Sequence, residues 1–130
     1  MKLNMRLLKP ALIVAAVIVI IFLTVPKFID TVERSKAGEA FNYLTTIRSA
    51  YEKYHSRSGT YMQNLRDLEI DSPNPQYFNV KDSDASKNNW SVTLQRKSGY
   101  GKYTVTFNKY GFDSQNSTIA KKINPIVRVN

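Results

Sequence analysis

Residues 28–57 read FIDTVERSKAGEAFNYLTTIRSAYEKYHSR, and apolar side chains recur in this stretch at steps of mostly three or four. This spacing matches the period of an α-helix, so it predicts a helix with one apolar stripe. Gly59 is a natural C-terminal stop for that helix. The stripe comprises Phe28, Val32, Ala37, Ala40, Phe41, Leu44, Ile47, Ala50, Tyr51 and Tyr54. The opposite face is charged and includes Asp30, Glu33, Arg34, Lys36, Glu39, Arg48, Glu52 and Lys53.

The stripe is preceded by an uncharged apolar run, from Ala11 to Val25. Its 15 residues fall short of the roughly 20 that cross a bilayer, but Lys9 and Lys27 flank it and can extend to the two interfaces. The basic start predicts a cytoplasmic N-terminus, with the rest of the chain outside. A cleaved secretory signal is the alternative, although residues 23–28 (LTVPKF) lack the small-x-small cleavage pattern. No loop signal separates the run from the stripe, so we predict one long helix that Pro26 bends.

The residues after Gly59 predict a β-rich head. Trp90–Arg96 alternates apolar and polar side chains, and so does Tyr103–Phe107, with a glycine-rich turn between them. This pattern predicts an antiparallel hairpin with one apolar face. The remaining expectations are a short helical turn at 64–68, a short strand at 77–80, a polar loop at 81–89, and an edge strand at Phe112 or at 117–123.

An antiparallel sheet with one apolar face needs a cover, and the helical stripe is the available one. The predicted fold class is therefore α+β, with a long N-terminal helix packed on a small antiparallel β-sheet. We divide the chain into a basic leader-like segment (1–9), an apolar transmembrane or filament-core half of the helix (10–27), an amphipathic half (28–58) and a β-rich globular head (59–130).

Four segments of this chain resemble the type IV pilin and type II secretion pseudopilin family. They are VPKF at 25–28, ERSKAGEA at 33–40, IRSAYEKY at 47–54 and SGTY at 58–61. The resemblance implies a pilin-like fold whose apolar helix sits in the inner membrane and then bundles into the core of a filament. The residues implied in that helix are Ala11, Leu12, Ile13, Val14, Val17, Ile18, Ile20, Ile21, Phe22, Leu23 and Pro26.

The same resemblance bears on processing of the N-terminus. Alignment on Pro26 places Asn4 where the family has the glycine of the cleavage point, and Met5 becomes the first mature residue. Lys9 stands where the family has a glutamate that is thought to pair with the N-terminal amine of a neighbouring subunit. Cleavage with methylation and a retained N-terminus both stay open at this point.

No residue pattern in the chain predicts an enzyme, a cofactor or a metal site. Cysteine is absent and His55 is the only histidine, which we expect on the surface. Asp82–Ser86 loosely resembles the start of a calcium loop, but the glycine turn and the closing glutamate are missing.

The charge of the chain is +9, and residues 87–130 hold eight basic residues against Asp113 alone. Basic groups beside exposed tyrosines suit a polyanion such as DNA, whereas the plainer interpretation is a solvated surface. The possible polyanion contacts are Arg96, Lys97, Lys102, Lys109, Lys121, Lys122 and Arg128.

Together these features predict a structural subunit of a type IV pilus-like or pseudopilus filament, assembled through its N-terminal hydrophobic helix. The resemblance implies copies of the chain and the pilus or secretion assembly machinery as partners. It implies the bacterial inner membrane before assembly, and a cell-surface or periplasmic filament afterwards. The alternative is a membrane-tethered pilin-like binding module whose basic head captures DNA or another polyanion.

Overall fold

The computed structural model describes residues 5–127. The chain divides into two units, residues 1–32 and residues 33–130. The described part of the first unit is helical throughout. This segment belongs to helix α1 (Met5–Ser58), which continues without interruption through Pro10 and Pro26 into the second unit.

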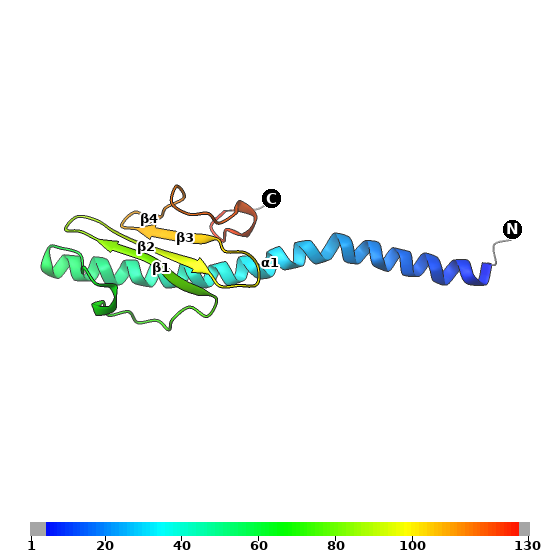
Figure 1. The fold of residues 1–130 in the computed structure, drawn as a ribbon, viewed down its shortest axis with the longest axis horizontal. Coiled ribbons are helices and arrows are strands. Elements are labelled where there is room, and N and C mark those ends of the chain that lie inside the picture. The colour runs from blue at the N-terminus through cyan, green and yellow to red at the C-terminus, as the bar shows by residue number, and fades with distance from the viewer. Residues whose placement is uncertain (1–4, 128–130) are drawn as a thin grey trace. The chain divides into compact units, whose positions relative to one another are not determined.

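The second unit contains a four-stranded antiparallel sheet beside the C-terminal half of α1 (Figure 1). Its strands are β1 (Phe78–Ala85), β2 (Trp90–Arg96), β3 (Thr104–Asn108) and β4 (Gly111–Phe112), in that spatial order. Two short 3₁₀ helices, η1 (Leu65–Asp67) and η2 (Lys121–Ile123), lie in the connecting segments. This arrangement confirms the predicted α+β class, with a long helix packed on a small antiparallel sheet.

The core of the second unit lies between the helical stripe and the β2–β3 hairpin. Tyr51 stacks on Trp90 with ring centroids 4.6 Å apart, and Leu44 is fully buried in the same cluster. A fully buried large apolar side chain contributes about 1.5–3 kcal/mol, so the buried residues of this cluster together stabilise the unit. The predicted inward faces of both strands are confirmed, because Trp90, Val92, Leu94, Tyr103, Val105 and Phe107 are all buried.

The buried part of the helical stripe begins later than the sequence predicted. Phe28 is 68% exposed and Val32 is 37% exposed, so their assignment to a buried stripe is wrong. Packing starts at Glu33 and Ala37, because the contacts between the sheet and α1 extend only as far as the end of β2, where Arg96 reaches Glu33.

One segment of the head differs from the predicted loop, and the edge strand lies at the first of its two predicted positions, Phe112 in β4. Residues 81–85 continue β1 as an edge strand instead of a polar loop, with an irregular register between Val80 and Asp82. Most side chains of β1 are exposed, so the strand is held by backbone pairing with β2. Its sequence therefore lacks the alternation of apolar and polar residues that would predict a strand. Residues 117–123 form no strand, because the side-chain oxygens of Ser117 and Thr118 accept the N–H groups of β3 instead.

The predicted caps are present. Gly59 takes a positive φ of 77° and donates its N–H to the His55 carbonyl oxygen at 2.8 Å, which closes the last turn of α1. Asn64 accepts the Arg66 N–H at 3.1 Å at the start of η1.

Candidate functional site

The helix of the first unit presents apolar side chains on all of its faces. Every residue from Ala11 to Val25 is exposed, and Phe22 reaches 76% and Leu23 65%. A helix that is apolar all round is typical of a membrane span or of the core of a helical bundle. Within residues 5–127, α1 is the one helix long and apolar enough to cross a membrane.

The residues that the resemblance implies for the membrane or filament helix all belong to the apolar half of α1, which we call the stem. Ala11, Leu12, Ile13, Val14, Val17, Ile18, Ile20, Ile21, Phe22, Leu23 and Pro26 are all exposed on α1. Lys9 is also exposed on the first turns of the helix, and α1 begins at Met5. Asn4 lies outside the described residues. The backbone of such a helix satisfies nearly all of its own hydrogen bonds, which lets its apolar surface enter lipid; the exception in the apolar run is the Phe22 carbonyl oxygen, to which Pro26 has no N–H to donate.

A buried ion pair lies within the second unit and includes its first residue, Glu33. The Arg96 Nε and Nη2 donate to the two carboxylate oxygens of Glu33 at 2.6 and 3.1 Å. The Tyr103 hydroxyl donates to Glu33 Oε1 at 2.5 Å. Glu33 comes from α1, Arg96 from the end of β2 and Tyr103 from the residue before β3, so the cluster fixes the helix against the hairpin.

The pKa of each ionisable group in this cluster is shifted by its surroundings. Burial raises the pKa of Glu33, but the hydrogen bonds from Arg96 and Tyr103 outweigh burial and bring that pKa below its ordinary value. The hydrogen bond to Glu33 raises the pKa of Arg96. Burial, followed by the hydrogen bond to Glu33, raises the pKa of Tyr103 well above its ordinary value. The cluster therefore holds a carboxylate, a guanidinium and a neutral phenol, which is a structural set with no free proton acceptor.

The lowered pKa of Glu33 predicts a specific loss of stability in acid. Below about pH 4.3, the ordinary pKa of a glutamate, the unfolded chain takes up a proton that folded Glu33 does not, so stability falls as pH falls. Urea unfolding of the full chain in detergent, followed by the fluorescence of Trp90, measures this between about pH 7 and pH 3. The Glu33→Gln variant should lose less stability over this range than the wild type. An equal loss in both proteins would contradict the assignment.

Two members of this cluster lie elsewhere than the sequence predicts. Glu33 was expected on the exposed face of the helix, and Arg96 among the polyanion contacts, but they are only 2% and 5% exposed. Both positions carried a signal, because Glu33 stands four residues before Ala37 in the stripe and Arg96 follows Trp90, Val92 and Leu94 on the inward side of β2. Arg96 is therefore removed from the set of polyanion contacts.

The other predicted basic residues stay at the surface. Lys97, Lys102, Lys121 and Lys122 are exposed, whereas Lys109 is partly buried and donates to the Asn88 carbonyl oxygen at 2.9 Å. Arg128 lies outside the described residues. His55 is partly buried and stacks on Tyr61 with ring centroids 4.3 Å apart. Asp82 and Asp84 lie on β1, and the described residues contain no cluster of three or more side chains suited to a metal ion.

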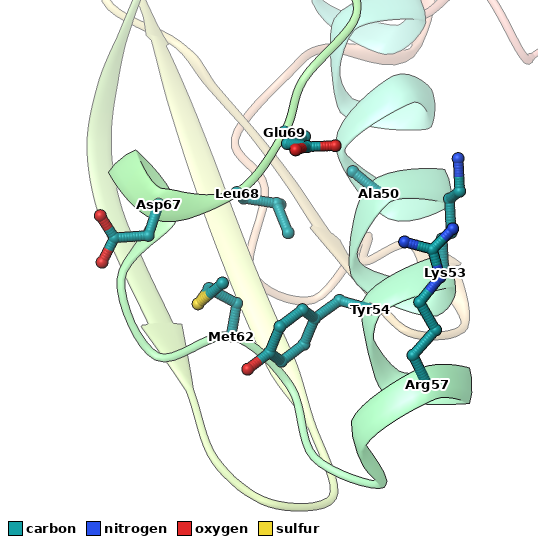
Figure 2. A pocket seen from close by; sticks show the side chains of 8 residues that line it. All are labelled: Ala50, Lys53, Tyr54, Arg57, Met62, Asp67, Leu68 and Glu69. Atoms are coloured by element: carbon teal, nitrogen blue, oxygen red, sulfur yellow. The ribbon is translucent and has the colours of Figure 1, made fainter.

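A pocket of about 240 Å³ lies between the last turns of α1 and the segment around η1 (Figure 2). Lys53 and Arg57 come from the helix, whereas Asp67 and Glu69 come from the facing segment. The apolar part of the lining is Ala50, Tyr54, Met62 and Leu68. The Asp67 carboxylate points away from Lys53 and Arg57 (Figure 2), and the lining provides no nucleophile paired with a base.

Comparisons of the chain with protein-family models, with curated proteins and with solved structures found no match.

Proposed function

We propose that this protein is a structural subunit of a type IV pilus-like or pseudopilus filament, held in the inner membrane before assembly by the apolar half of α1. The observation that carries the proposal is the uniform exposure of the helix from Ala11 to Val25. Soluble proteins seldom expose apolar patches larger than about 300–600 Å². A helix of this kind needs lipid or the helices of other copies around it, and a filament subunit meets both environments in turn.

The continuity of α1 supports a retained stem over a discarded signal. The helix runs unbroken from Met5 to Ser58, and its second half carries Leu44 and Ile47 in the core under the sheet. Removal of the apolar run at residues 23–28 would cut this helix in its middle. Cleavage near Asn4 would leave the stem whole, and it stays compatible with the proposal.

Electron microscopy of material sheared from producing cells tests the proposal. We expect thin filaments that an antibody against the head decorates, and intact-mass measurement of the same material shows whether the N-terminus is processed. A mass that lacks residues 1–4 and carries one added methyl would indicate pilin-type maturation. Recovery of the protein only as dispersed membrane monomers would contradict assembly.

A further inference from the structure

Six cations of the head gather around the point where the chain enters it. They belong to α1, to the β2–β3 turn and to the segment around η2, and the turn and this segment lie at the end of the sheet where α1 enters the head (Figure 1). We call this set the basic collar: Arg34, Lys36, Lys97, Lys102, Lys121 and Lys122.

One side of the collar lies beside the start of β1. The Lys36 ammonium sits 4.7 Å from the centre of the Tyr77 ring. The Lys97 ammonium donates to the Gln76 carbonyl oxygen at 3.0 Å. Lys97 directly follows Arg96, whose contact with Glu33 ties this turn to the helix. Two cations and a partly exposed tyrosine therefore lie together on this side.

The other side of the collar lies beyond β3. Tyr100, Lys102 and Lys122 line an open depression of about 500 Å³ together with the backbone around Ala120. Arg34 donates to the carbonyl oxygens of Pro125 and Val127, which brings the C-terminal segment against the helix. That segment also carries Ile126, which is 60% exposed. Cations, an aromatic ring and an exposed aliphatic side chain therefore share this surface.

Two acidic groups close to the collar are engaged within the head, the exposed Asp71 lies beside the segment that packs near Gly38, and other acids of the head lie farther away. Glu33 is paired with Arg96, and Glu39 accepts the Tyr77 N–H at 3.0 Å. Asp67 and Glu69 line the pocket beside the last turns of α1. Asp84 pairs in register with Ser91 at the end of β1–β2 that lies opposite Arg96. The excess positive charge of the head is thus concentrated at the end of the sheet where Arg96 contacts Glu33.

We propose that the basic collar binds anionic lipid headgroups on the membrane face from which the apolar helix emerges. The proposal rests on the membrane anchoring proposed above. Glu33 follows Pro26 by seven residues, which is about 10 Å along a helix, so the anchor delivers the collar to the headgroup region. Lysines beside tyrosines are typical of membrane interfaces, and each cation near an anionic surface favours contact about fivefold. A nucleic acid is the less suitable partner, because the same anchor places a bilayer beside this surface.

Spin labels on the full chain test this proposal. The chain contains no cysteine, so Ser98→Cys in the β2–β3 turn and Asn88→Cys in the β1–β2 turn each give one labelling site. Both positions are exposed and lie at opposite ends of the sheet. The labelled chains are reconstituted in vesicles of phosphatidylcholine alone or enriched in phosphatidylglycerol. A paramagnetic ion chelated to a lipid headgroup then reports how near each label lies to the surface.

We expect phosphatidylglycerol to increase relaxation of the label at position 98 severalfold and to leave the label at position 88 unchanged. The triple variant K97Q/K102Q/K121Q should weaken surface contact on the order of a hundredfold and abolish the increase. The matched control K53Q/R57Q/K87Q removes three exposed cations elsewhere in the head and should retain it.

Four results would overturn the proposal, and vesicle flotation separates a failure of the collar from a failure of the anchor. If the protein floats with the vesicles but phosphatidylglycerol has no effect at position 98, the proposed anchor stands and the proposed lipid binding by the collar is wrong. Equal loss in the triple variant and its control would assign the effect to net charge alone. Duplex DNA bound through the collar lysines, without any effect of phosphatidylglycerol, would assign the surface to nucleic acid. A protein that does not float overturns the anchor, and the collar proposal with it.

Discussion

Replacing Arg96 with methionine should lower the free energy of unfolding of the head by about 3–5 kcal/mol, because Glu33 would then be buried without its cation. Glu33 is 2% exposed, and both of its oxygens accept hydrogen bonds from the guanidinium. The Tyr103 hydroxyl would be the remaining donor to that carboxylate. Domains of this size have total stabilities of about 5–15 kcal/mol, so the loss is a large share. Urea unfolding of the full chain in detergent, followed by Trp90 fluorescence, measures it.

The double variant Glu33→Leu/Arg96→Met provides the control for this prediction. It removes both charges together, and replacing a buried ion pair with apolar side chains of similar volume is often neutral or stabilising. We therefore expect the double variant to be more stable than Arg96→Met alone. If Arg96→Met costs less than about 1 kcal/mol, the pair contributes no more than an exposed salt bridge, and its proposed role in fixing the helix against the hairpin is wrong.

This ion pair also illustrates which parts of the fold the sequence can predict. The stripe around Leu44 and the hairpin strands were predictable, because their burial repeats with a local period of 3.6 or 2 residues. The local period places Glu33 and Arg96 each on an inward face, but it does not show that these two charges pair across 63 positions of the chain. The polar part of β1 escaped prediction because one strand neighbour, and not an apolar face, holds it in place.

The same distinction applies to the two surfaces on which the proposals rest. The stem from Ala11 to Val25 was predictable from composition alone, since its apolar residues are contiguous in the chain. Four cations of the basic collar were visible only as part of the excess of basic residues after residue 87, and Arg34 and Lys36 only as members of the charged helix face. Its position depends on the pairing of β2 with β3 and on the contact of Arg34 with the Val127 carbonyl oxygen, which joins segments from three parts of the sequence.

Replacing Ile18 with arginine should release most of the protein from the membrane. Ile18 lies at the middle of the apolar run and is 47% exposed on α1. A run of this length spans about 22 Å as a helix, whereas the hydrocarbon core is about 30 Å thick. We therefore expect the free energy of insertion to be only slightly favourable. An arginine at the centre of a spanning helix costs about 2.5–3.5 kcal/mol, which reduces insertion on the order of a hundredfold. Resistance of the full chain to carbonate extraction measures the inserted fraction.

Two variants separate this effect from general damage to the helix. Ile18→Leu keeps the apolar volume and should be extracted no more readily than the wild type. Thr24→Arg places the same charge near the end of the run, where the long side chain can reach the interface, so it should reduce insertion far less than Ile18→Arg. If the two arginine variants behave alike, depth in the bilayer does not matter and the apolar half of α1 does not span it. If Ile18→Arg inserts normally, but filaments are lost, the apolar surface serves contacts between helices and not the membrane.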